Sequence, residues 1–193
     1  FYTLFIFLEE AYFQDKLKAI FKTEKQFQLT KTILAKIDYS VSRYLGLKTL
    51  LSCITGLFSY VALLIIGVDS PAFWAFLIFL LNYIPTVGSL IATAFPAIFS
   101  ILQFATFMPG ILVLVCVGLI QVFVGNFLEP KLMGNSLNIS SLVAILALSF
   151  WGVLWGVTGM ILSIPITVII LIIISQFEST KPLAIMLSEK GQL

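Results

Sequence analysis

The sequence predicts an all-α, polytopic membrane protein, a helical bundle, and three observations support that fold class. Sixty per cent of the 193 residues are apolar and only 10% are charged, with a mean hydropathy of +1.11. Soluble domains carry about 25% charged residues, so this chain lacks the polar side chains to cover a water-exposed surface. Long apolar segments follow one another along most of the chain, and the basic residues are confined to three regions.

The chain begins with the apolar run FYTLFIFL, which has the character of the last turns of a hydrophobic helix. It lacks the charged start and the small-residue cleavage site of a signal peptide. We therefore expect residues 1–8 to be the end of a truncated transmembrane helix whose upstream neighbours are missing.

Residues 9–48 are the one stretch with the composition of a soluble segment, and we expect them to lie in the cytoplasm. Within them Ile33, Ile37 and Val41 recur at helical spacing, with basic side chains on the other side. This pattern predicts an amphipathic helix. It lies along the membrane interface, packs on another subunit or serves as a connector on its own protein, and the sequence leaves these three placements open.

Residues 49–177 are predicted to form the transmembrane transport domain, and residues 178–193 a cytoplasmic tail. The apolar segments run over residues 49–68, 71–84, 90–105, 111–128 and 141–174. A hydrocarbon core of ~30 Å needs roughly 20 helical residues. Segment 71–84 rises only about 21 Å, so it crosses barely or turns back. Segment 141–174 has room for about two spans.

The positions of the basic residues predict the orientation. Eight of the eleven Lys and Arg lie between Lys16 and Lys48, and the others are Lys131, Lys181 and Lys190. With residues 9–48 inside, six apolar segments, crossing or paired as hairpins, return the other basic residues to the same side. The opposite loops hold no Lys or Arg, as the positive-inside rule requires.

Two apolar runs are interrupted in a similar way. The residues concerned are Pro85, Gly88 and Pro96 in the first run, and Gly156, Gly159 and Pro165 in the second. Proline removes a helical N–H and frees a carbonyl, while glycine permits close backbone approach. Paired breaks of this kind indicate a transporter's midplane site. They form re-entrant hairpins related as an inverted repeat, or kinks in spanning helices, and both geometries stay open.

Segment 111–128 carries a stripe of small and polar residues. Gly118, Gln121, Gly125 and Glu129 follow one another at i, i+3, i+7 and i+11 and so share one face of a helix. Such a stripe is a seam for helix packing or a face that lines a solute path.

The following residues, Asn126 to Lys131, end this segment, with Pro130 expected to terminate the helix. Ionisable groups near membrane depth are costly and are commonly functional. Glu129 and Lys131 are therefore candidates for gating or proton coupling, the alternative being that they snorkel to the headgroups. Gly134 is a candidate hinge. Asn82, beside the first break, either caps freed backbone groups or binds hydroxyls of a solute.

The residues and motifs typical of metal sites, cofactor sites and enzymes do not occur in this sequence. Histidine is absent, and Cys53 and Cys116 stand alone in apolar runs, so we predict neither a metal site nor a cofactor. No phosphate-binding loop or nucleophile motif occurs. We therefore expect no enzyme and no nucleic-acid partner.

Two blocks of the sequence resemble the autoinducer-2 exporter (AI-2E) family of transporters. They are LLNYIPTVGSLIA and NFLEPKLMGNSLNISSLVAILALSFWGVLWGVTGMILSIPI, within a resemblance from about Asp38 to Phe177. The motif N-x-x-E-P-K-x-x-G followed by W-G-x-x-W-G-x-x-G is the specific part. Two mild departures are Ser141, where the family usually has proline, and Leu162-Ser163-Ile164-Pro165, where L-A-V-P is common.

The resemblance implies a multi-pass, oligomeric protein of the bacterial inner membrane. Family members are linked to export of the quorum-sensing signal autoinducer-2, and others to sodium/proton antiport. We accordingly predict a secondary transporter exporting a small polar solute, with a lipid bilayer, that solute and copies of itself as partners. The expected path residues are Asn82, Pro85, Gly88, Gln121, Gly125 and Asn126. The alternatives are a sodium/proton antiporter and a non-transporting membrane scaffold.

Overall fold

The computed structural model describes Phe5, Glu9, Tyr12, Gly191 and residues 16–21, 23–133 and 139–189. These residues form helices and turns without a strand, which confirms the predicted all-α class. The helices are α2 (Glu24–Ile66), α3 (Pro71–Leu81), α4 (Val87–Phe104), α5 (Phe107–Phe123), the π-helix η1 (Val124–Leu128), α6 (Glu129–Met133), α7 (Ser141–Ile174) and α8 (Lys181–Leu187). The predicted end of a transmembrane helix at residues 1–8 lies, apart from Phe5, outside the described residues.

The described helices have the length and composition of membrane spans. Four segments qualify, namely Glu24–Ile66, Val87–Phe104, Phe107–Met133 and Ser141–Ile174. Large apolar side chains such as Leu57, Leu102 and Val153 face outward. An apolar exterior is costly in water and stable in lipid. The chain is therefore part of a multi-pass membrane protein.

The chain divides into two compact units, Phe1–Tyr39 and Ser40–Leu193. In the first unit Phe27 is buried, and the ammonium of Lys18 lies 5.8 Å from the centre of its ring. Helix α2 is continuous from Glu24 to Ile66. The predicted amphipathic helix and the first predicted span are thus parts of one helix.

A tight turn connects α2 to α3. The N–H of Gly67 donates to Leu63 O and that of Val68 to the same carbonyl, and Gly67 has a φ of 84°, which is the usual way for a helix to end in glycine. Gln103 of α4 fastens this turn. Its Nε2 donates to Gly67 O (3.0 Å) and its Oε1 accepts from the N–H of Asp69 (2.8 Å).

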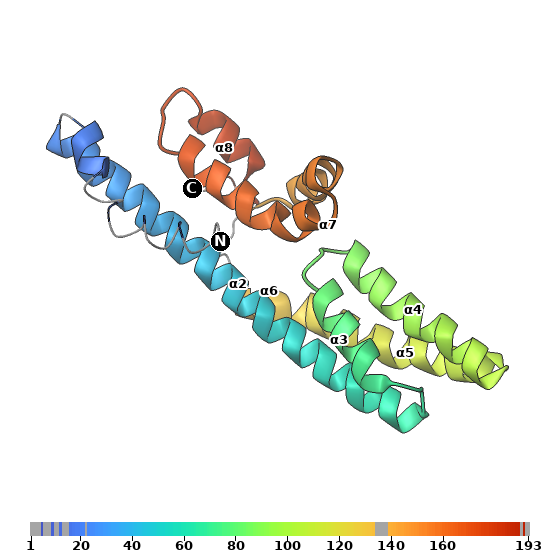
Figure 1. The fold of residues 1–193 in the computed structure, drawn as a ribbon. Coiled ribbons are helices and arrows are strands. Elements are labelled where there is room, and N and C mark those ends of the chain that lie inside the picture. The colour runs from blue at the N-terminus through green and yellow to red at the C-terminus, as the bar shows by residue number, and fades with distance from the viewer. Residues whose placement is uncertain are drawn as a thin grey trace. The chain divides into compact units, whose positions relative to one another are not determined.

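Helices α3, α4 and α5 lie beside the C-terminal half of α2 (Figure 1). Their shared core consists of Leu63, Val68, Ile78, Ala92, Ala97, Val113 and Val117. Helix α5 begins at Phe107, so Pro109 and Gly110, which lie between the predicted apolar segments 90–105 and 111–128, belong to its first turn. Proline is tolerated there because the first N–H groups of a helix have no intrahelical partner.

Helix α3 is too short to cross a bilayer. Its 11 residues rise about 17 Å, against a hydrocarbon core of ~30 Å. The chain then breaks over residues 82–86 and returns as α4. The predicted interruption is confirmed, and α3 and α4 form a helical hairpin whose tip is at residues 82–86.

Helix α7 contains the second predicted break. Gly156 adopts φ 61° and ψ −140° inside it. A Cβ at Gly159 would overlap the carbonyl oxygen of Trp151, and one at Gly152 would lie 3.1 Å from the side chain of Met160. The limbs on either side of Gly156 therefore fold back on each other, in agreement with the room for about two spans in segment 141–174. The start of α7 is tied to α8 through Ser140 N–H and Leu187 O (3.1 Å).

Candidate functional site

A partly buried ion pair joins α2 to the helix that contains Glu129. The Nζ atom of Lys48 lies 2.8 Å from Oε1 of Glu129, and the two side chains are 5% and 30% exposed. Removing an ammonium group from water is costly unless a partner compensates its charge. The carboxylate of Glu129 supplies that compensation for Lys48.

The tip of the α3–α4 hairpin is attached to α2 next to this ion pair. Asn82 Nδ2 donates to Ser52 Oγ (3.0 Å), and the hydroxyls of Thr49 and Tyr83 are 2.6 Å apart. Asn82 and Ser52 are both buried. The amide of Asn82 thus contacts a neighbouring helix rather than capping the break.

Local sequence explains why the hairpin turns at this point. Thr86 has a φ of 55°, and Pro85 cannot donate a backbone hydrogen bond. A Cβ at Gly88 would overlap the carbonyl oxygen of Leu81. Only glycine therefore permits the second limb to start so close to the end of the first.

The π-helix η1 immediately precedes Glu129, whose backbone N–H donates to Val124 O, five residues earlier. Pro130, expected to end the helix, instead lies inside a helical segment that continues to Met133. The wider π turn separates the proline ring from the carbonyls of the preceding turn, which an α-helix would bring into collision. π-helical turns are frequent at functional sites.

A buried polar face of α2 lies between the ion pair and the apolar core. Leu63 and Val117 belong to the core, and Lys48 and Glu129 pair at the other end, so α2 and α5 are antiparallel. On α2 this face carries Ser52, Thr55 and Ser59, all fully buried. We call this set, together with Gln121 of α5, the polar seam.

Two atoms of the polar seam have no hydrogen-bond partner. Among the described residues, Ser59 Oγ and Gln121 Nε2 are the buried side-chain polar atoms in this condition. The hydroxyl of Thr55, by contrast, donates to Leu51 O (2.9 Å). An unpaired buried hydroxyl or amide costs roughly 1–3 kcal/mol.

The predicted path residues lie at three places, the hairpin tip, the polar seam and η1. Asn82, Pro85 and Gly88 form or flank the hairpin tip, and Gln121 lies in the polar seam. Gly125 and Asn126 belong to η1 and are exposed. Glu129 reaches α2, whereas Lys131 is exposed on α6.

The predicted hinge residues lie at separate places. Pro96 is buried inside α4, and Pro165 is buried inside α7. Gly156 and Gly159 form the break in α7 described above. Gly134 lies outside the described residues.

Sequence reasoning missed the contribution of α2. Lys48, Ser52, Thr55 and Ser59 are spaced at i, i+4, i+7 and i+11, which places them on one helical face. Small hydroxylated residues repeated at this spacing in an apolar segment are the signal that would have found them. Lys48 is the last residue of the predicted cytoplasmic region, and its side chain is buried against Glu129.

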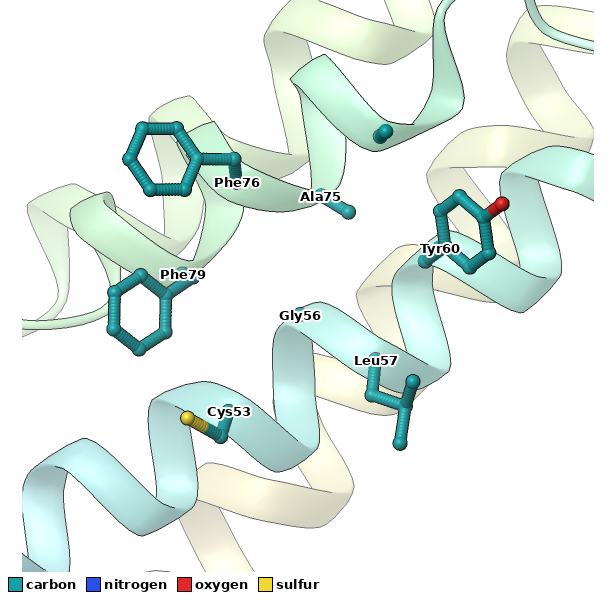
Figure 2. A pocket seen from close by; sticks show the side chains of 8 residues that line it. Cys53, Gly56, Leu57, Tyr60, Ala75, Phe76 and Phe79 are labelled. Carbon is teal, nitrogen blue, oxygen red and sulfur yellow. The ribbon is translucent and has the colours of Figure 1, made fainter.

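An apolar groove opens between α2 and α3 (Figure 2). It measures about 450 Å³ and is lined by Cys53, Gly56, Leu57, Tyr60, Ala72, Ala75, Phe76 and Phe79. Gly56 brings the helices together, with Ala75 O and Phe79 Cβ 3.2 and 3.3 Å from the position of an added Cβ. This lining offers almost no polar atom and does not suit a polar solute. Nor does any cluster of metal-binding side chains occur in the described part of the chain.

Comparison with known proteins identifies related transporters. The sequence matches the model of the AI-2E family transporters over residues 1–179. It is 45% identical over 150 residues to the AI-2 transport protein TqsA of Escherichia coli K12, which covers 78% of this chain and 43% of that protein. A protein of Borreliella burgdorferi is 36% identical over 192 residues, covering 97% of this chain and 52% of that protein.

A more distant relative has a different stated activity. The sodium-lithium/proton antiporter of Halobacillus andaensis is 26% identical over 167 residues, which is 86% of this chain and 46% of the antiporter. The chain spans about half the length of the curated relatives it matches.

Proposed function

Because this chain belongs to the AI-2E family of transporters, we propose that it carries part of a path for exporting a small polar solute, with autoinducer-2 as the first candidate. The observation that carries the proposal is the convergence on α2. Asn82 from the hairpin tip and Glu129 from the end of η1 both contact the same buried polar face, at Ser52 and Lys48.

This convergence supplies the two features that a solute path requires. Hydroxyl and amide groups at the hairpin tip and in the polar seam replace hydrogen bonds that a polar solute loses on leaving water. A broken hairpin and a π-helix are elements that rearrange without melting a whole span. The ion pair closes the region at the Lys48 end of α2.

The geometry also supports the predicted topology. Lys48 and Glu129 lie at the same end of the bundle, as the count of apolar segments requires if both are near the cytoplasmic face. We place the protein in the inner membrane, oriented by the positive-inside rule, and assembled from several copies. Transport is driven by an ion gradient or by the gradient of the solute itself, without an enzymatic step.

Export from cells carrying the full-length protein tests the proposal. Extracellular autoinducer-2 should exceed that of empty-vector cells, and Gln121→Leu and Glu129→Gln should lower it while the protein remains inserted. Gln121→Leu removes an amide from the polar seam, and Glu129→Gln removes the ionisable partner of Lys48. Wild-type export at the empty-vector level would refute autoinducer-2 as the solute.

The antiporter is the second candidate, favoured by the relatedness to the Halobacillus protein and by the ionisable pair at the junction. Sodium-dependent proton movement in proteoliposomes distinguishes it. Exchange that Glu129→Gln abolishes would favour the antiporter. A protein that neither exports autoinducer-2 nor exchanges sodium for protons would favour the third alternative, a non-transporting membrane scaffold.

A further inference from the structure

Ser59 is an unusual serine for a buried helical position. Its side chain is fully buried, yet its hydroxyl has no hydrogen-bond partner. Ser100 and Ser163, which are equally buried, donate to the carbonyls of Ala97 (2.9 Å) and Met160 (2.7 Å). A helical serine normally satisfies its hydroxyl in this local way.

Gln121 is placed to share a ligand with Ser59. Ser59 lies one turn before Leu63 of α2, and Gln121 lies one turn after Val117 of α5. Leu63 and Val117 belong to the same core cluster and Lys48 pairs with Glu129, so one turn from each core residue towards the ion pair brings Ser59 and Gln121 to the same level along the two helices. Two buried polar atoms without partners, Ser59 Oγ and Gln121 Nε2, thus belong to one level of the bundle.

The level of Ser59 and Gln121 is closed towards one end of the bundle and continues as a polar face towards the other end. The apolar core at Leu63 and Val117 closes one end. Towards the other end the α2 face continues through Thr55 and Ser52 to Lys48. An opening of the junction at Lys48 would therefore connect Ser59 and Gln121 with water.

We propose that Ser59 and Gln121 form a contact site for the transported solute at the inner end of the polar seam. This inference rests on the proposed transport function and adds Ser59 as a residue that touches the solute. Hydroxyl or carbonyl oxygens of a small polar molecule supply the partners that both side chains lack. A buried polar group without a hydrogen-bond partner lowers the stability of the protein while no ligand is bound. Binding of a solute would therefore account for a buried Ser59 hydroxyl that lacks a local partner.

Alanine substitution separates a solute contact from a packing role. Ser59→Ala in the full-length protein should reduce autoinducer-2 export at least threefold and leave the melting temperature unchanged or higher, because it deletes a buried hydroxyl without a partner. Ser100→Ala is the matched control, and it should leave export unchanged. Equal export by Ser59→Ala and wild type, or an equal loss in Ser100→Ala, would overturn the proposal.

Thiol labelling tests the site without assuming the solute. In a background with Cys53→Ala and Cys116→Ala, Ser59→Cys in proteoliposomes should react with a water-soluble methanethiosulfonate at least tenfold faster than Ser100→Cys. Equal rates would overturn the proposal, since no aqueous path would then reach the seam. Fast labelling combined with no wild-type export would preserve the site and refute only autoinducer-2 as its ligand.

Discussion

The ammonium of Lys48 lies 2.8 Å from the carboxylate of Glu129, 81 residues later in the sequence. The two partners are unequally buried, with 5% of the Lys48 side chain and 30% of the Glu129 side chain exposed. A charge left without its partner is more costly at the more buried position. The pair should therefore respond unequally to loss of either member.

We expect Glu129→Leu to cost about 3 kcal/mol of stability, because it leaves the buried ammonium of Lys48 unpaired. Lys48→Met should cost less, since water reaches the remaining carboxylate. The double variant should lose less than the sum of the two, because neither charge is left alone. Unfolding in detergent measures all three, and additive losses would contradict a direct interaction.

A disulfide across the hairpin tip should stop transport reversibly. Ser52→Cys with Asn82→Cys, in the cysteine-free background, replaces the hydrogen bond between these side chains by a covalent link. If the hairpin tip moves away from α2 during transport, oxidation abolishes export and reduction restores it. The control pair, Asp69→Cys with Gln103→Cys, links the turn between α2 and α3 to α4. Its oxidation should not affect export, and inhibition by both pairs would exclude a motion specific to the tip.

Substitution of Gly88 should destabilise the protein far more than substitution of Gly125. A Cβ at Gly88 would overlap the Leu81 carbonyl oxygen, whereas one at Gly125 would meet no atom within 4 Å. Overpacking of this kind lowers the free energy of unfolding by about 1–3 kcal/mol. Because the atom in the way is a backbone oxygen, which cannot move aside as a side chain can, we expect Gly88→Ala to lie at the upper end of this range. Thermal melting of both alanine variants measures the difference. Similar melting temperatures would show that the tip is not fixed as described.

Deletion of Gly125 should leave Lys48 coupled to Glu129. The π-helix holds one residue more than an α-helical turn accommodates, so a deletion that restores α-helix keeps the direction in which the following residues face. Double-variant analysis of Lys48→Met and Glu129→Leu in this background should then still give a loss smaller than the sum of the single losses. Gly125→Ala, which keeps the chain length, is the control and should retain the coupling as well. Additive losses after the deletion, but not in Gly125→Ala, would show that the π turn itself is needed to orient Glu129.

The all-α class, the membrane environment and the two helix breaks could be predicted from the order of the amino acids. Those features depend on composition and on local backbone chemistry, as at Pro85, Gly88 and Gly156, and local chemistry is visible in the order of the residues. Asn82, Gln121 and Glu129 could be selected as candidates in the same way, because polar groups in apolar segments are costly enough to stand out, and their roles in transport stay predictions.

Which of these groups come into contact depends on the way the helices pack, and this could not be predicted from the sequence. The pairing of Lys48 with Glu129 depends on the antiparallel packing of α2 and α5. The direction in which the Glu129 side chain points depends on a π-helix, which the periodicity of an α-helix does not predict. Assuming an uninterrupted α-helix, the sequence placed Gly125 on one face with Gln121 and Glu129, whereas the π turn changes the register between them. Contacts between distant segments depend on the packing of whole helices, and no local pattern determines that packing.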